Sequence, residues 1–97
     1  LLCLARALAV RPDVLLLDEP TSSLDPMSTE AVEELLTRLK EKVTIVIVTH
    51  NLAQARRVSD RTAFFHDGHL VETGPTAALF ETPGRSETAR YLRGQFG

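Results

Sequence analysis

The sequence of 97 residues has one cysteine, no tryptophan and only a small excess of negative charge. A single cysteine excludes an intramolecular disulfide, so packing and hydrogen bonds must hold the fold together. Lysine and arginine number 11 and aspartate and glutamate 13, which leaves a formal net charge of −2 and no basic surface for nucleic acid. Apolar runs such as residues 14–17 and 45–48 are far shorter than the roughly 20 residues of a membrane helix. We expect a soluble, globular chain of one domain at most.

Two apolar runs without polar alternation predict neighbouring strands in the N-terminal half. Residues 14–17 are all Val or Leu, and residues 43–49 are β-branched at every position, a pattern typical of parallel strands that are covered on both faces. Between the two runs, Asp25 and Pro26 form an N-cap and first-turn signal, and apolar residues recur at helical spacing as far as Leu39. The order strand, helix, strand predicts a right-handed parallel unit.

Other signals predict the elements on either side of this unit. Residues 1–10 are strong helix formers with no cap in front, so we expect the second part of a helix that ends before Pro12. Asn51 can cap a short helix after the second strand. Asp67-Gly68 lies between two short strand-like segments and predicts a hairpin whose turn needs positive φ. Two short helices are expected after the hairpin.

Three chemically active residues follow the two predicted strands. Asp18 and Glu19 come directly after residues 14–17, and His50 follows the second strand. Because ligands bind at the carboxyl ends of the strands in an open parallel sheet, we expect these side chains to lie near one ligand. Asp18 continues the strand and suits Mg²⁺, which binds one or two carboxylates together with water and phosphate oxygens. Glu19 can orient or deprotonate a water, and His50 can donate a hydrogen bond to a phosphate oxygen while neutral.

These residues belong to a longer pattern. Leu15 to Pro20 resembles the Walker B motif of the ATP-binding subunits of ABC transporters, Ser22 to Asp25 resembles their D-loop, and Thr49-His50 resembles their switch histidine. The resemblance covers essentially all of residues 1–97, which it identifies as the C-terminal portion of an ABC-type ATP-binding domain. It implies an α/β fold, the C-terminal part of a P-loop NTPase domain (RecA-like, ABC-type), with parallel strands, crossover helices and a C-terminal antiparallel hairpin.

The resemblance also implies a role for each matching residue. Asp18 would hold Mg²⁺ through water, Glu19 would polarise the water that attacks ATP, and His50 would contact the γ-phosphate. Glu19 and His50 are thus the implied catalytic residues, and Asp18 and His50 the implied cofactor-binding residues for ATP and Mg²⁺. Ser23 and Asp25, in the D-loop, would meet a second ATP-binding subunit in a head-to-tail dimer.

The C-terminal part narrows the resemblance to one kind of transporter. Residues 61–65, 70–76 and 91–97 look like the tail of bacterial phosphate-importer ATPases. This implies an enzyme, an ATPase that powers phosphate import as a peripheral subunit at the cytoplasmic face of the cell membrane. Its partners would be the second ATP-binding subunit, the transmembrane permease subunits and, indirectly, a periplasmic or extracellular phosphate-binding protein. No nucleic acid partner is implied.

The sequence departs from the family pattern by what it does not contain. No Gly-x-x-x-x-Gly-Lys-Ser/Thr occurs in it, and the signature motif is also missing. We therefore expect these residues alone to be inactive in ATP hydrolysis and to expose an apolar face of their sheet. Three alternatives stay open: an ABC ATPase of another importer or of a non-transport ABC protein, a non-catalytic fragment that docks on another chain, and a stand-alone hydrolase that uses Asp18 and Glu19.

Overall fold

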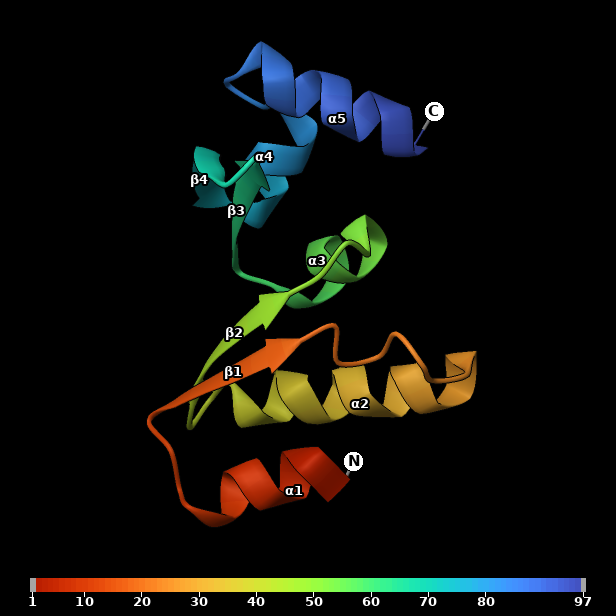
Figure 1. Ribbon diagram of the computed structural model, residues 1–97, viewed down its shortest axis with the longest axis vertical. Helices are drawn as coiled ribbons and strands as arrows, with labels where there is room; N and C mark the ends of the chain where they lie inside the picture. The colour runs from red at the N-terminus through yellow and green to blue at the C-terminus, as the bar shows by residue number, and fades with distance from the viewer. Residues whose placement is uncertain (1, 97) are drawn as a thin grey trace. The chain divides into compact units, whose positions relative to one another are not determined.

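The computed structural model describes residues 2–96, which form one unit that ends at His50 and a second that begins at Asn51. The first unit contains α1 (Leu2–Ala9), β1 (Val14–Asp18), α2 (Pro26–Leu39) and β2 (Thr44–Val48) (Figure 1). The second contains α3 (Leu52–Val58), β3 (Arg61–His66), β4 (His69–Pro75), α4 (Thr76–Glu81) and α5 (Ser86–Phe96). The predicted α/β arrangement of parallel strands, crossover helix and antiparallel hairpin is confirmed. None of the helices in residues 2–96 is long and apolar enough to cross a membrane.

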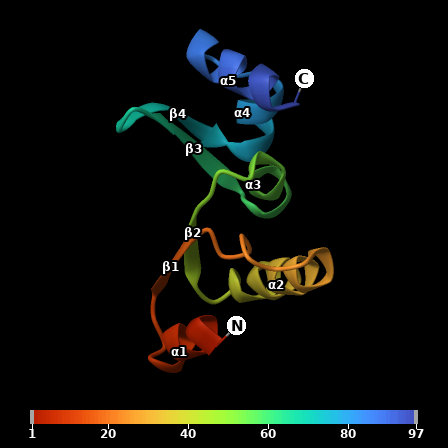
Figure 2. The ribbon, with the colours of Figure 1, turned by 45° about the vertical axis from the view of Figure 1, so that its right-hand side comes forward.

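In the first unit, β1 and β2 pair in parallel. Leu15 lies opposite Ile45, and Asp18 lies opposite Val48, so the two strands end at the same edge. The connecting helix α2 runs along one face of the strand pair in both views (Figures 1 and 2). The order strand, helix, strand predicts a crossover connection, and α2 provides it.

The start of α2 follows its sequence signals. The Asp25 side chain accepts a hydrogen bond from the backbone N–H of Ser28 at 3.0 Å, and Pro26 is the first residue of the helix. One side of the helix buries Val32 and Leu36, which are 4% and 3% exposed, and Leu15 of β1 is buried to the same degree. Apolar side chains of β1 and α2 thus form the core of this unit.

The other face of the strand pair is open. It carries Val14, Leu16, Val46 and Val48, whose exposed fractions lie between 45% and 66%. Exposure alternates along both strands, as the pleat requires, because the intervening residues face α2. The prediction that both faces are covered is therefore wrong for the described residues, since α2 covers one face only. The predicted exposure of an apolar face is confirmed.

The second unit begins with a capped helix and continues into the hairpin. The Asn51 side chain accepts a hydrogen bond from the backbone N–H of Gln54 at 3.0 Å, which confirms the predicted cap of α3. Strands β3 and β4 pair antiparallel around Asp67 and Gly68, whose φ values of 50° and 76° are those of a two-residue hairpin turn. The predicted hairpin and its positive φ are thus confirmed.

The hairpin packs against the helices that follow it (Figure 2). The ring of Phe64 on β3 packs at a tilt of 40° against that of Tyr91 on α5, with the ring centroids 4.7 Å apart. The next residue, Phe65, is 61% exposed, so the two phenylalanines lie on opposite faces of the strand. The strand register shifts between them, an unexpected β-bulge that adds a residue to β4 at this point.

Polar contacts join the elements of the second unit. The hydroxyl groups of Ser59, Thr62 and Thr76 lie within 2.8–3.0 Å of one another and connect the end of α3, β3 and the start of α4. The carboxylate of Glu72 on β4 accepts the backbone N–H groups of Gly84 and Arg85, at 2.7 and 3.0 Å, just ahead of α5. Glu72 therefore caps a helix to which it is not adjacent in the sequence.

Candidate functional site

The chain turns sharply at the edge where the two parallel strands end. The backbone N–H of Glu19 donates to the carbonyl of Val48 at 2.7 Å, which extends the strand pairing by one step beyond Asp18. Glu19 has a φ of 47°, in the left-handed region that glutamate seldom adopts. The backbone conformation thus sends the side chain of Glu19 in a direction that a continued strand would not allow.

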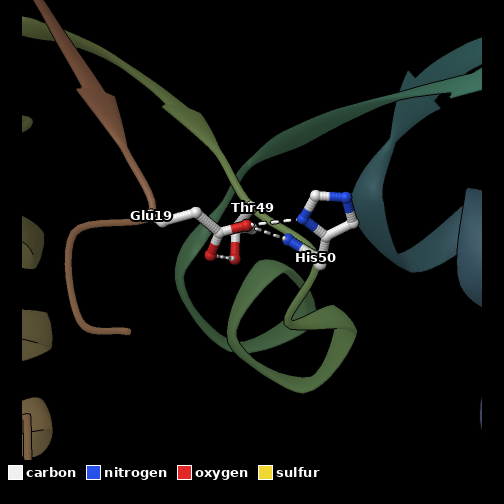
Figure 3. A network of polar contacts seen from close by, with 3 residues as sticks. All are labelled: Glu19, Thr49 and His50. Atoms are coloured by element: carbon white, nitrogen blue, oxygen red, sulfur yellow. Dashed lines mark hydrogen bonds and ion pairs between the residues drawn. The ribbon is translucent and has the colours of Figure 1, made fainter. Parts of the chain in front are cut away.

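The Glu19 carboxylate is the centre of a hydrogen-bond network (Figure 3). Its Oε1 accepts the backbone N–H of His50 at 2.7 Å and lies 2.7 Å from the ring Nδ1 of the same residue. Its Oε2 accepts the hydroxyl of Thr49 at 3.1 Å. The structure therefore brings the two predicted catalytic residues, Glu19 and His50, into direct contact.

These hydrogen bonds stabilise the ionised carboxylate. The contact with the His50 ring, followed by the His50 backbone N–H and the Thr49 hydroxyl, lowers the pKa of Glu19 below its ordinary value of 4.5. Burial opposes this effect, but the hydrogen bonds prevail and the pKa stays lowered. Glu19 is consequently an anion at neutral pH, able to accept hydrogen bonds and not to donate them.

The contact with Glu19 decides which ring nitrogen of His50 holds a proton. A carboxylate only accepts, so the proton between Nδ1 and Oε1 belongs to Nδ1. In a neutral ring Nε2 is then an acceptor, and the single N–H is already donated to Glu19. In this arrangement His50 donates to a further oxygen only when both nitrogens are protonated, which differs from the neutral donor that we expected. The ring itself is 92% exposed and open to a ligand.

Asp18 takes no part in this network. It is the last residue of β1, its side chain is exposed, and within residues 2–96 it makes no hydrogen bond or ion pair. An uncommitted carboxylate of this kind fits Mg²⁺, which takes one or two carboxylates and completes its shell with water and phosphate. Glu19 fits the ion less well, because donors already occupy both of its oxygens. Among the described residues, no group of three or more potential ligands converges on one point.

The two predicted D-loop residues have different surroundings. Ser23 is exposed in the turn before α2. The side chain of Asp25 is engaged in capping α2, and its hydrogen bonds with Ser28 lower the pKa of Asp25. Neither residue contacts Glu19 or His50 through a hydrogen bond in the part of the chain described.

Thr49 is the member of the network that we did not predict. Because Thr49 is the last residue of the β-branched run, the sequence pattern predicts that it belongs to the strand. In the structure, β2 ends one position earlier, at Val48. A signal was available, because a hydroxyl that follows a strand lies at the same edge as the acids that follow its parallel neighbour. Only the structure shows that this hydroxyl reaches Glu19.

Comparisons with known proteins show what the chain is similar to. Residues 1–53 match the family model described as "AAA domain, putative AbiEii toxin, Type IV TA system". All 97 residues align at 63% identity with phosphate import ATP-binding protein PstB 2 of Mycobacterium tuberculosis (strain ATCC 25618 / H37Rv), of which they cover 35%.

Two further relatives carry a similar name. The phosphate import ATP-binding protein PstB of Mycobacterium intracellulare is 65% identical over 92 residues, which are 95% of this chain and 32% of that protein. PstB of Corynebacterium efficiens is 59% identical over 102 residues, covering 99% of this chain and 40% of that protein. The chain thus spans about a third of the length of the curated relatives it matches. Since the family model matches more than half of its residues, the chain belongs to the AAA-domain family.

Proposed function

We propose that the full-length protein that contains this chain is the ATP-hydrolysing subunit of an ABC importer, and that its cargo is phosphate. Residues 1–97 would be the C-terminal portion of its ATP-binding domain. The observation that carries the proposal is the ionised Glu19 carboxylate, held by Thr49 and His50 at the edge where ligands of parallel sheets bind. The identity of 59–65% with phosphate import ATP-binding proteins supports the cargo.

Glu19 would orient the water that attacks the γ-phosphate of ATP. A carboxylate has about four places for hydrogen-bond donors, two on each oxygen. Oε1 already accepts two hydrogen bonds, both from His50, whereas Oε2 accepts one, from Thr49. The remaining place on Oε2 would receive the water, whose oxygen then points its lone pair at phosphorus.

His50 would stabilise charge on the transferred phosphoryl group. With both ring nitrogens protonated, it donates one N–H to Glu19 and offers the other to a γ-phosphate oxygen. The exposure of the ring leaves room for this contact. Glu19 and His50 would thus act as the catalytic residues, with His50 also part of the nucleotide site.

Asp18 would hold Mg²⁺ through water, as its exposed and uncommitted carboxylate allows. When bound, Mg²⁺ neutralises negative charge on the phosphate oxygens. Ser23 and Asp25 would lie at the interface with a second ATP-binding subunit. The dimer would work with transmembrane permease subunits at the cytoplasmic face of the membrane, and indirectly with a phosphate-binding protein outside it.

Hydrolysis of ATP by the purified full-length protein tests the proposal. Glu19→Gln keeps the size of the side chain and removes its charge, so kcat should fall by about 100-fold or more while ATP still binds. Glu34→Gln, the same change at an exposed position of α2, is the matched control and should leave kcat unchanged. Full activity of Glu19→Gln would exclude Glu19 from this role.

Phosphate uptake tests the cargo separately. Cells whose only copy of the protein is Glu19→Gln should lose phosphate import, whereas Glu34→Gln should support it. Normal phosphate uptake in the Glu19→Gln cells, combined with lost ATP hydrolysis in the purified variant, would mean that the protein energises the transport of something else.

A further inference from the structure

The two oxygens of Glu19 are held by different kinds of donor. Oε1 accepts two hydrogen bonds, from the backbone N–H and the ring of His50. Oε2 accepts from the hydroxyl of Thr49 alone among the described residues (Figure 3). The oxygen with capacity for a further donor is therefore the one whose position depends on a single side chain.

A contact to one oxygen does not fix a carboxylate. The torsion angle of the terminal bond of glutamate has a broad distribution. A carboxylate that is held only at Oε1 can therefore still rotate and move Oε2. A second donor on Oε2, from a different residue, restricts this rotation. Thr49 suits the task because it is β-branched, with few allowed side-chain rotamers, and because it is half-buried at the strand end. The His50 ring, in contrast, is 92% exposed.

We propose that Thr49 is a positioning residue for ATP hydrolysis: its hydroxyl fixes Oε2 of Glu19, the oxygen that is left to hold the attacking water. The inference rests on the proposed function of Glu19. Thr49 itself contacts neither the water nor the nucleotide in this scheme. Its loss should consequently affect the chemical step and leave substrate binding intact.

The test uses the full-length protein and three variants. Thr49→Val replaces the hydroxyl by a methyl group of similar size, and Thr49→Ser keeps the hydroxyl while removing the methyl group. Thr44→Val makes the same change as the first variant at the opposite end of β2, where the hydroxyl makes no hydrogen bond within residues 2–96. Steady-state ATP hydrolysis gives kcat and KM for each, and thermal melting confirms that each is folded.

We expect Thr49→Val to lower kcat about tenfold, equivalent to about 1.4 kcal/mol, with KM for ATP within about twofold of the parent. Thr49→Ser and Thr44→Val should stay within about twofold in both constants. If Thr49→Val does not fold, Thr49→Ala removes the same hydroxyl without adding an apolar methyl group, and the same fall in kcat is expected of it.

Other results would overturn the proposal in distinguishable ways. A parental kcat in Thr49→Val, or a kcat in Thr49→Ser as low as that in Thr49→Val, would exclude a positioning role for the hydroxyl. An increase in KM with unchanged kcat would place Thr49 in nucleotide binding instead. These outcomes leave Glu19 untouched as long as Glu19→Gln is inactive, whereas an active Glu19→Gln would remove the proposed function itself.

Discussion

The unit that ends at His50 buries apolar side chains at its core, whereas the unit that begins at Asn51 buries mainly polar ones. Among the residues whose burial is described, the first unit buries three apolar side chains of β1 and α2, Leu15, Val32 and Leu36, and one polar residue, Thr21. In the second, Leu79 is accompanied by three buried polar residues, which are Gln54, Thr76 and Thr88. The first unit is thus stabilised mainly by apolar burial, whereas in the second the hydroxyl groups of Ser59, Thr62 and Thr76 add directed hydrogen bonds.

The difference bears on where the candidate site lies. Apolar contacts between α2 and the strand pair fix the strands without using any polar group at their ends. The network of Glu19, Thr49 and His50 is therefore available for a ligand. In the second unit, Ser59, Thr62 and Thr76 satisfy one another, and Glu72 is committed to a helix cap. These four polar side chains hold the second unit together and have little capacity left for a ligand.

The largest expected effect is on the apolar core. Leu36→Ala in the full-length protein should lower the free energy of unfolding by about 2–5 kcal/mol, because Leu36 is 3% exposed and its loss leaves a cavity. Urea unfolding followed by circular dichroism measures the loss. Met27→Ala, on the same helix but 81% exposed, should change stability by no more than about 0.5 kcal/mol. Equal effects of the two substitutions would contradict the apolar core assigned to the first unit.

A smaller effect is expected for the hydroxyl cluster. Thr76→Val should cost about 1–3 kcal/mol, because Thr76 is 5% exposed and its methyl replacement leaves the hydroxyls of Ser59 and Thr62 short of a partner. Thr76→Ser keeps the hydroxyl and should cost about 1 kcal/mol, the contribution of the lost methyl group. If Thr76→Val is the milder of the two, hydrogen bonds do not hold this unit together.

The smallest expected effect depends on pH and concerns Glu72. The backbone N–H groups of Gly84 and Arg85 lower the pKa of Glu72 below its ordinary value of 4.5. A carboxyl group with a lowered folded-state pKa stabilises the fold at pH values above 4.5, and this contribution disappears as the pH falls through the folded-state pKa. Glu72→Gln should therefore melt at a lower temperature than the parent at pH 7, and the difference should shrink as the pH falls below 4.5.

Glu87→Gln is the control for the charge change. Glu87 lies in the first turn of α5, where Glu72 provides the cap, but it accepts no hydrogen bond in the described part of the chain. Its substitution should have a smaller, less pH-dependent effect on the melting temperature. An identical pH profile for the two variants would mean that charge near the helix end matters and the cap does not.

Features set by neighbouring residues were predictable from the sequence. Three local predictions were confirmed: the start of α2 at Asp25 and Pro26, the cap of α3 at Asn51, and the hairpin turn at Asp67-Gly68. Each of these signals acts within a few residues of its own position. The edge that gathers Glu19 and His50 followed from the carboxyl ends of two parallel strands. Local signals and one topological rule were sufficient for these features.

Features that depend on distant residues were not predictable in the same way. Glu72 reaches N–H groups 12 and 13 positions away, and the hydroxyl of Thr49 reaches an acid 30 positions away. Such contacts depend on rotamers and on the final packing, which periodicity and capping rules do not describe. The open face of the strand pair was misjudged for a related reason, because an apolar run does not specify which element covers it.

The positive φ of Glu19 has an evolutionary consequence. Glycine or asparagine fits a φ of 47° with less steric cost than glutamate, yet neither supplies a carboxylate. Under the function proposed for Glu19, selection for stability and selection for ATP hydrolysis favour different residues at this one position. A lineage released from the need for this carboxylate would then drift toward glycine or asparagine, so the residue at this turn would record whether a descendant still uses it.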